Sequence, residues 1–226
     1  MTRIVVKLGG RVAAVAATRA GALADEGNEV VVVHGAGPQI TEELVRRGLR
    51  PVFEAGRRVT TAEVLVVVRE SMAAVNAQVC AALGERAIGL AGDEIGLPAA
   101  RVEALGLVGE PAAAAPAAVV AALEEGRIPV VAPLCVDAGG EVLNVNADEA
   151  AAALAVGLAA DRILFVSDVP GVLVDGEVVE ELLADQADHM LVGGAFEGGI
   201  VPKLVAAVRA ARGGVPAAIG VTEVVA

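Results

Sequence analysis

Short runs of β-branched residues alternate with longer helical stretches along almost the whole chain. Two early runs, Arg3–Leu8 and Glu29–Val33, are apolar nearly throughout, which is typical of buried strands. Consecutive parallel strands need long crossover connections, and helices are the usual crossover. The alternation therefore predicts an α/β fold, a three-layer αβα sandwich with a mainly parallel open sheet.

The expected elements follow from these runs and from the residues that bound them. We expect strands over Arg3–Leu8, Glu29–Val33, Ala87–Leu90, Val130–Pro133, Arg162–Val166 and, from a weaker pattern, Ala217–Val221. We expect helices over Val12–Glu26, Pro38–Arg47, Thr61–Leu83, Pro116–Glu125, Asp148–Leu158 and Pro202–Arg212. A glycine stands near the end of each helix, as a left-handed C-cap should: Gly27, Gly48, Gly84, Gly126, Gly157 and Gly213. Two segments outside this alternation, Leu49–Thr60 and Ile95–Gly109, should form hairpins over one end of the sheet.

Composition and charge limit the function classes. The 226 residues are 56% hydrophobic but only 1% aromatic, so the core must be aliphatic, in one large domain or in two lobes sharing a sheet. A net charge of −12 argues against nucleic acid and anionic membrane as partners, because both bind basic patches. Charges interrupt the apolar runs before the roughly 18 residues that a membrane span needs. Met1 to Arg3 lead directly into a strand without a signal-peptide pattern, so we expect a cytoplasmic protein.

The cysteines and histidines indicate neither a zinc site nor a disulfide framework. Cys80, Cys135, His34 and His189 fall in no spacing that metal ligands use. We therefore expect no metal ligand from the protein itself.

The basic residues include only two lysines, Lys7 and Lys203, among 17 lysines and arginines. A lysine is a compact point charge on a flexible stem, whereas an arginine is a broad planar fork, so a site for a transferring phosphoryl group can require lysine. The presence of only these two lysines is equally consistent with chance.

Two glycine-containing loops follow strands. Val5–Gly10 ends in Lys7-Leu8-Gly9-Gly10, and Val30–Pro38 ends in His34-Gly35-Ala36-Gly37-Pro38. Ligands of open α/β sheets bind beyond the carboxyl ends of strands, where small residues and helix N-termini present backbone N–H groups to anions. Each loop alone is also compatible with an ordinary strand-to-helix turn.

Two further segments carry polar groups that could hold a substrate. Gly56–Thr60 contains Arg57 and Arg58, and an arginine can bind a carboxylate through two parallel hydrogen bonds, although most surface arginines only solvate a face. Leu143–Glu149 carries Asn144 and Asn146, followed by Asp148 at the start of a helix. Asp148 could be a simple helix cap, or a buried acid that orients both lysines. Phe165–Leu173 and Gly198–Lys203 place glycine, proline and polar groups at element edges, as expected around a nucleotide.

Taken in order, these segments resemble the acetylglutamate kinase branch of the amino acid kinase family, from residue 3 to about Gly214. The Asn-Val-Asn-Ala-Asp run is the most specific element. The resemblance implies an amino acid kinase-like fold, with a substrate lobe over residues 1–160 and a nucleotide-binding lobe over 161–226 that is shortened at its C-terminus. It also implies a homodimer insensitive to arginine.

The resemblance assigns roles to individual residues. It implies that Lys7 and Lys203 stabilise the transferring phosphoryl group and that Asp148 organises them. The acceptor, N-acetyl-L-glutamate, would bind at Gly9, Gly10, Gly35, Ala36, Gly37, Arg58 and Asn144. ATP, carrying Mg²⁺, would bind at Ser167, Asp168, Val169, Pro170, Gly171, Val172, Leu173, Ala195, Phe196, Glu197 and Gly199. A methyl group at Ala36 departs from the family's glycine, and it would be strained if Ala36 had a positive φ.

Two alternatives remain open. A related kinase of lysine biosynthesis phosphorylates aminoadipate or glutamate on an acidic carrier protein, but a docking face for that carrier should be basic, and this chain is acidic. A non-catalytic ligand-binding protein on the same scaffold is the other. Retention of both lysines argues against it.

Overall fold

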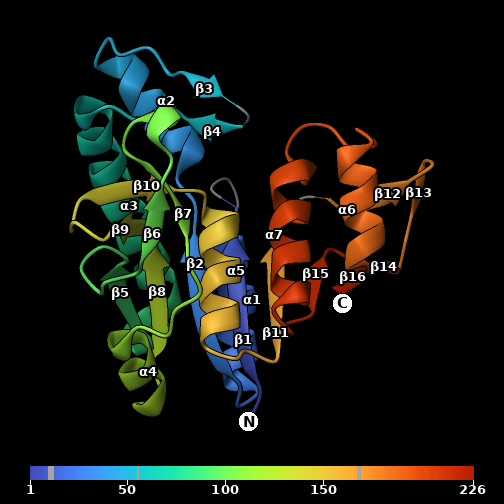
Figure 1. The fold of residues 1–226 in the computed structure, drawn as a ribbon. Coiled ribbons are helices and arrows are strands. Elements are labelled where there is room, and N and C mark those ends of the chain that lie inside the picture. Colours follow the sequence, from blue (N-terminus) through green and yellow to red (C-terminus); the bar gives the residue numbers. More distant parts are fainter. Residues whose placement is uncertain (10–12, 55, 167–168) are drawn as a thin grey trace.

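The computed structural model of the chain describes residues 1–9, 13–54, 56–166 and 169–226. Its main element is an eight-stranded sheet, whose strands run across Figure 1 from β5 on the left to β14 on the right. From one edge to the other, its strands are β14 (Glu181–Leu183), β16 (Thr222–Val225), β15 (Ala217–Ile219), β11 (Arg162–Val166), β1 (Arg3–Leu8), β2 (Glu29–His34), β8 (Ile128–Ala132) and β5 (Ala87–Ala91). All neighbours pair in parallel except β15 and β16. The predicted mainly parallel open sheet is confirmed.

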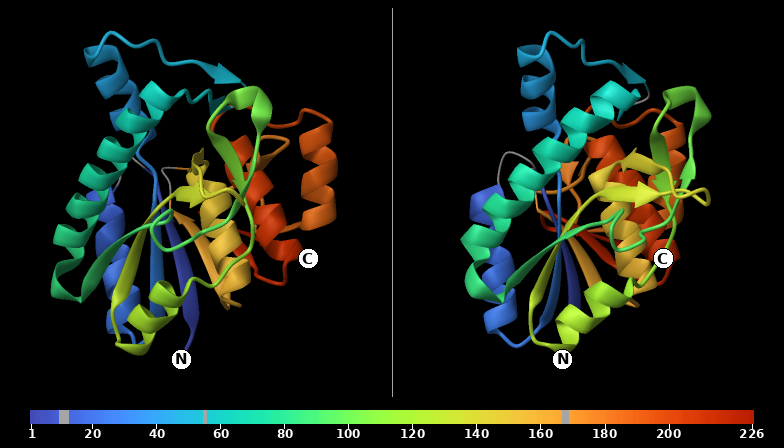
Figure 2. Two further views of the ribbon diagram at one scale, coloured as in Figure 1. Left: turned by 60° about the vertical axis from the view of Figure 1, so that its left-hand side comes forward. Right: turned by 90° about the vertical axis from the view of Figure 1, so that its left-hand side faces the viewer.

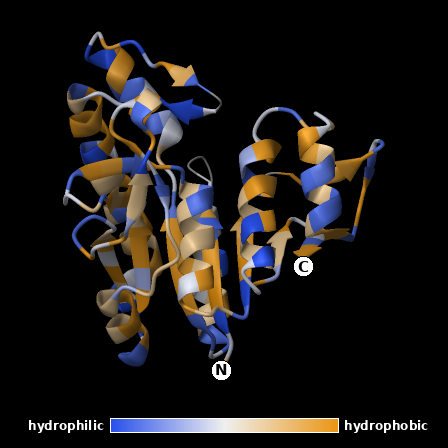
Figure 3. Ribbon diagram, viewed as in Figure 1, coloured by the Kyte–Doolittle hydropathy of each residue, from blue (hydrophilic) through white to orange (hydrophobic). Residues whose placement is uncertain are grey.

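The sheet is covered on both faces because successive side chains of each strand point to opposite sides. In β1, Ile4, Val6 and Leu8 belong to one apolar cluster and Val5 to the other. Helices α1 (Ala13–Asp25) and α3 (Ala62–Leu83) cover the first face, and α4 (Ala117–Glu124), α5 (Ala147–Gly157) and α7 (Ile200–Arg212) cover the second (Figure 2). Figure 3 shows the result, with apolar strands between helices of mixed polarity. The αβα sandwich is therefore confirmed.

Both predicted hairpins form. Leu49–Thr60 contains β3 (Phe53–Glu54) and β4 (Arg57–Arg58), and Ile95–Gly109 contains β6 (Ala99–Arg101) and the start of β7 (Val108–Pro111). Strands β6 and β7 continue into β10 (Val142–Val145) and β9 (Leu134–Val136), giving a second sheet of four strands. The remaining elements are α2 (Gly37–Arg46), α6 (Ala184–Val192), two short 3₁₀ turns (Gly84–Arg86 and Glu103–Leu105) and the small β12–β13 hairpin (Leu173–Val174 and Glu177–Val178). Residues 161–226 add four strands to the sheet that residues 1–160 begin, and the division into two lobes stays a prediction.

The glycine caps are only partly as predicted. Gly27, Gly48, Gly84 and Gly126 have positive φ, as left-handed caps require. The prediction is wrong for Gly157 and Gly213, neither of which has a positive φ. Gly157 is instead needed for close packing, since a Cβ there would lie 2.2 Å from the carbonyl oxygen of Ala114.

Helix α3 with its following turn, Ala62–Arg86, is the one segment in the described ranges that is long and apolar enough to cross a membrane. In the structure one face of this helix is buried, and Val67, Val68 and Met72 pack in the core against the sheet. Thr61 begins the helix as its N-cap and accepts a hydrogen bond from the N–H of Val64 at 3.3 Å. The apolar face of α3 is therefore accounted for by core packing.

Candidate active site

A cavity of about 300 Å³ opens where β1 and β2 end, between the N-termini of α2 and α5 and beneath the β3–β4 hairpin. Carboxyl ends of adjacent parallel strands meet at one edge of a sheet, which is where such folds bind ligands. Apart from Gly10, which lies outside the described residues, every catalytic or acceptor-binding residue predicted from the sequence lines it: Lys7, Gly9, Gly35, Ala36, Gly37, Arg58, Asn144, Asp148 and Lys203.

Two lysines share one carboxylate in this cavity. The Nζ of Lys7 lies 2.8 Å from Oδ1 of Asp148, and the Nζ of Lys203 lies 3.9 Å from the same oxygen. Lys7 and Asp148 are each 5% exposed, so water screens their attraction little. Two ammonium groups and one carboxylate leave a net positive charge, which an anionic ligand can neutralise.

Local structure brings these groups together. Lys7 shares a face of β1 with Val5, and that face is covered by α5 and α7. Asp148 lies in the first turn of α5, where Oδ1 of Asn146 caps the helix by accepting hydrogen bonds from the N–H groups of Asp148 (2.8 Å) and Glu149 (3.3 Å). Lys203 lies in the first turn of α7.

The loop after β2 offers backbone N–H groups to an anion. Helix α2 begins there, and its N-cap residue Ala36 makes no side-chain capping bond. Ala36 has φ −135°, so its methyl group causes no backbone strain, and it is packed in the core. A Cβ at Gly37 would meet nothing within 4 Å, so the loop leaves open space on the cavity side.

His34 anchors this loop from below. It is fully buried, and its Nε2 accepts a hydrogen bond from Nδ2 of Asn76 at 3.1 Å. The same Asn76 nitrogen donates to the carbonyl oxygen of Val130 at 2.8 Å, which ties α3 to β2 and β8. Burial lowers the pKa of His34 to about 4, so the imidazole is neutral at pH 7.

The two adjacent arginines differ in their partners. Arg58 is buried, stacks on the ring of Phe53 (4.5 Å to the centroid), and donates from Nη2 to Oγ1 of Thr41 (2.8 Å) and the carbonyl oxygen of Gly37 (3.2 Å). Its Nη1 is buried with no hydrogen-bond partner, and no acid pairs with it, within the described part of the chain. Desolvation lowers the pKa of this guanidinium. Arg58 therefore keeps a charge and a donor available for an anionic ligand.

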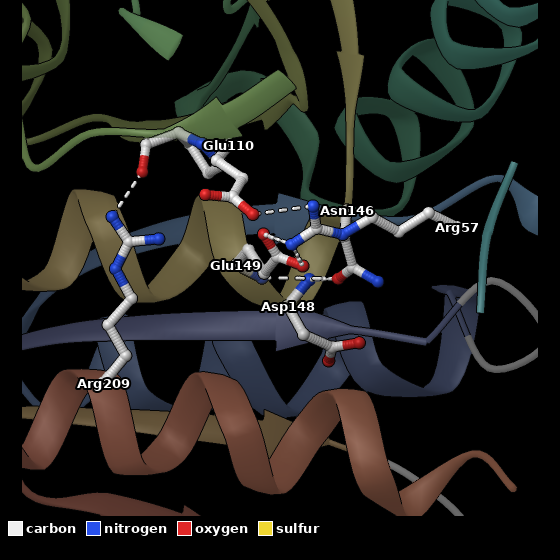
Figure 4. Close-up of polar contacts among 7 residues, drawn as sticks. Arg57, Glu110, Asn146, Asp148, Glu149 and Arg209 are labelled. Atoms are coloured by element: carbon white, nitrogen blue, oxygen red, sulfur yellow. Dashed lines mark hydrogen bonds and ion pairs between the residues drawn. The ribbon is translucent and has the colours of Figure 1, made fainter. Parts of the chain in front are cut away.

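Arg57 is already neutralised by two acids. Its Nη1 lies 2.8 Å from Oε1 of Glu110, and its Nη2 lies 3.0 and 3.1 Å from the two carboxylate oxygens of Glu149 (Figure 4). Of the two arginines, Arg58 is thus the better candidate for binding a carboxylate.

Asn144 reaches the cavity from β10. It is buried, and its Nδ2 donates to Oγ1 of Thr60 at 3.1 Å. That hydroxyl in turn donates to the carbonyl oxygen of Arg58, so Asn144 and the arginine hairpin are joined through one threonine.

A second cavity of about 370 Å³ adjoins Lys203 on its other side. Seven residues predicted to contact a nucleotide line it: Val169, Pro170, Gly171, Leu173, Phe196, Glu197 and Gly199. Two others do not. Val172 is fully buried in the core, with its N–H bonded to Oγ1 of Thr222, and Ala195 is exposed outside the lining. Ser167 and Asp168 lie outside the described residues. Lys203 lines both cavities and so stands between them.

The sequence profile of the amino acid kinase family matches residues 2–220. The chain belongs to the amino acid kinase family. Within this family it is similar to proteins named acetylglutamate kinase: 42% identical to one from a Nocardioides species, in an alignment over 85% of this chain and 66% of that protein, and 40% identical to one from Salinispora tropica, over 95% and 80%. The resemblance predicted from the motifs is confirmed, and the chain spans about two thirds to four fifths of these relatives' lengths.

Solved structures of similar shape agree with the family's fold. The structure of smu.665 from Streptococcus mutans UA159 aligns with a TM-score of 0.87 at 27% identity, over 99% of this chain and 98% of that one. Carbamate kinase from Giardia lamblia bound to AMP-PNP aligns with a TM-score of 0.74 over 99% and 98%, but at 14% identity this likeness concerns the fold alone.

The sequence did not reveal the residues that contact the side chains of Arg57 and Arg58. Thr41 and Phe53 fix Arg58, and Glu110 and Glu149 fix Arg57. Only Glu149 carried a signal, because it directly follows Asp148 in the most specific motif.

Proposed function

We propose that this protein transfers the γ-phosphoryl group of ATP to the γ-carboxylate of N-acetyl-L-glutamate, a step of arginine biosynthesis. The observation that carries the proposal is the buried Asp148 carboxylate with a lysine on each side, where the two cavities meet at Lys203. Similarity to acetylglutamate kinases over most of the chain supports this acceptor.

The acceptor would occupy the cavity beneath the hairpin. Its α-carboxylate would bind Arg58, whose buried Nη1 has no other hydrogen-bond partner among the described groups. Asn144 would contact the acetamido group, and the N–H groups of the loop from Gly35 to Gly37 would face the γ-carboxylate. This arrangement needs no movement of Arg57, which its two acids already neutralise.

The donor would occupy the second cavity. Residues 169–173 and 196–199 would surround the nucleotide, and its phosphates would point toward Lys203. In the described ranges, no group of three or more acidic, histidine or cysteine side chains could hold a metal ion by itself. Mg²⁺ would arrive on the phosphates of ATP, where it would supply charge neutralisation.

In the reaction, an oxygen of the γ-carboxylate forms a bond to the γ-phosphorus while the bond to the β,γ-bridging oxygen breaks, giving an acyl phosphate and ADP. No proton has to move, because a carboxylate is already ionised at neutral pH. The chain must instead align two anions and offset their repulsion. Lys7 and Lys203 would stabilise the charge on the transferring group, and Asp148 would keep both ammonium groups in place.

The test is ADP release by the full chain with N-acetylglutamate, with N-acetylaminoadipate, and with no acceptor. We expect turnover with the first only, and a loss of about 100-fold or more in kcat for Lys7→Ala, since removing one preorganised charge donor has that effect. Arg86→Ala, which removes an exposed arginine paired with Asp25, is the matched control and should leave kcat unchanged. Near-wild-type turnover of Lys7→Ala would refute the mechanism. A background of ADP release that is the same with either acceptor and with none would favour a binding protein.

The assembly and location belong to the same proposal. We propose a cytoplasmic protein that binds small molecules and no nucleic acid or membrane, supported by the net charge of −12 and by the biosynthetic names of the relatives. We also propose that it is a homodimer, as the family resemblance implies. Light scattering on the purified chain would give its mass directly, and a monomer at micromolar concentration would contradict the dimer.

A further inference from the structure

The β3–β4 hairpin that carries Arg58 has few apolar contacts of its own. Each strand has only two residues, and Phe53 at 53% and Val52 at 43% are largely exposed. A short two-stranded hairpin is marginal in water without further packing. Its base is joined to the body through Thr60, which bonds to the backbone of Leu105 and Leu107. Beyond the base, Arg58 attaches β4 to α2 through Thr41 and the carbonyl oxygen of Gly37, and Arg57 makes further polar contacts.

Arg57 supplies the polar attachment nearest the tip of this hairpin. Its guanidinium lies between Glu110 of β7 and Glu149 of α5 (Figure 4). The side chain of Glu149 is 10% exposed and binds with both oxygens, whereas that of Glu110 is 55% exposed and binds with one. Glu149 is therefore the more shielded partner, and removal of Arg57 would leave its charge buried and unpaired, whereas exposed ion pairs contribute little.

Both acids are themselves held in place. Glu149 lies in the first turn of α5, which Asn146 caps. Glu110 precedes Pro111, whose carbonyl oxygen accepts a hydrogen bond from Nη2 of Arg209 on α7 (Figure 4). Arg57 thus joins the hairpin to α5, which packs against the main sheet, and to β7, a strand of the second sheet.

We propose that Arg57, Glu149 and Glu110 form a clamp that holds the β3–β4 hairpin, and with it Arg58, over the acceptor cavity. The clamp residues are positioning residues that act through Arg58. This inference rests on the proposed function, since it names what fixes the group that binds the acceptor's α-carboxylate.

The position of the clamp favours this role over simple surface stabilisation. Arg57 lines the acceptor cavity, and Arg57 and Glu149 also line a third cavity, of about 510 Å³, whose lining includes Phe196 and Glu197 of the donor cavity. Asp148, which contacts both lysines, directly precedes Glu149, and the two side chains leave the helix in different directions (Figure 4). One helical turn thus fixes the hairpin and the lysine pair relative to each other.

The test compares steady-state kinetics of Arg57→Ala, Glu149→Gln, Glu110→Gln and the double variant Arg57→Ala/Glu149→Gln. We expect KM for N-acetylglutamate to rise about tenfold in the first two, which corresponds to about 1.4 kcal/mol. Glu110→Gln should give a smaller rise, and kcat and KM for ATP should stay near wild type, because the lysines are untouched. KM of the double variant should be no higher than KM of Arg57→Ala, because Arg57→Ala has already removed the Arg57–Glu149 interaction.

The matched control is Arg212→Ala. Arg212 also pairs with two acids, Asp185 and Asp188, and it lines none of the cavities described above. Its removal should leave both KM values unchanged. A clamp variant with unchanged KM, or with kcat reduced as much as kcat/KM, would overturn the proposal.

A second measurement separates this inference from the proposed function. Hydrogen exchange of the hairpin amides, including that of Val59, which donates to Val52 at 3.0 Å, should be faster in Arg57→Ala and Glu149→Gln than in wild type. If wild-type protein shows no turnover with N-acetylglutamate, the proposed function fails, but exchange still reports on the clamp. Unchanged exchange in both variants would overturn the clamp whatever the activity. Glu149→Gln preserves side-chain volume and so guards against misfolding of Arg57→Ala.

Discussion

The buried His34 makes stability depend on pH between 7 and 5. Its imidazole is fully buried beneath the loop after β2, and burial lowers its pKa from 6.5 to about 4. In the unfolded chain the same group binds a proton as the pH falls below 6.5. Between pH 6.5 and 4, unfolding therefore takes up a proton, and lowering the pH favours the unfolded state.

The size of this effect follows from the two pKa values. Proton linkage with 6.5 for the unfolded state and about 4 for the folded state gives a loss of about 2 kcal/mol in unfolding free energy between pH 7 and pH 5. Domains are stable by only about 5–15 kcal/mol, so one histidine removes a substantial fraction of the total.

Urea unfolding at pH 7 and pH 5 measures this term. His34→Gln removes the titrating group, so its unfolding free energy should fall by about 2 kcal/mol less than that of wild type between these pH values. Any pH-independent cost of the substitution cancels in this comparison. The chain's other histidine provides the control, because His189→Gln changes an exposed position on α6 and should follow wild type. If His34→Gln and wild type lose equal stability, the imidazole is not held neutral by burial and the reasoning fails.

Three further predictions test packing, charge and acceptor binding. Gly157→Ala should lower the unfolding free energy by about 1–3 kcal/mol, because its Cβ would lie 2.2 Å from the backbone oxygen of Ala114. Gly21→Ala inside α1 should instead raise the unfolding free energy by about 1 kcal/mol, because alanine favours the helix and its Cβ meets no atom at a clashing distance. Urea unfolding measures both changes. Desolvation raises the pKa of Glu149, so ionising this carboxyl costs folded-state stability as the pH rises above 4.5. In the same assay, wild type should therefore lose stability relative to Glu149→Gln between pH 5 and pH 8. A difference in unfolding free energy between the two proteins that stays constant with pH would contradict this. Arg58→Lys should raise KM for N-acetylglutamate about tenfold with little change in kcat, since lysine has no planar fork for a carboxylate, and an unchanged KM would exclude Arg58 as the carboxylate ligand.

The central strands could be predicted because their burial leaves a local signal. Arg3–Leu8 and Arg162–Val166 are apolar except for Lys7 and the arginine that begins each of them, and both are observed with the predicted bounds. Strand β16 and helix α6 were not predicted. In α6 only Ala184 and Ala187 are buried, and two alanines give too weak an apolar face to mark a helix in the sequence.

The site could be predicted where one residue type carries the chemistry and could not where partners are distant in sequence. The two lysines and Asp148 were predicted from motifs, and the structure brings them together. The choice between Arg57 and Arg58 depends on Glu110 and Glu149, which lie 53 and 92 residues from Arg57. The family resemblance had already assigned the acceptor to Arg58, but no local pattern reports which arginine those acids will neutralise, so the physical reason for the choice requires the fold.

The first turn of α5 links the residues that we propose bind the acceptor to those that we propose bind the transferring phosphoryl group. Asn146 fixes the backbone of this turn, Asp148 holds both lysines, and Glu149 holds Arg57 and the hairpin with Arg58. Because a helical turn is rigid, the backbone of this turn and its cap fix the spacing between Asp148 and Glu149, and the ion pairs of these two acids place the lysines and the hairpin relative to each other. For a reaction that needs no proton transfer, such fixed spacing between two anion-binding groups is the main catalytic requirement.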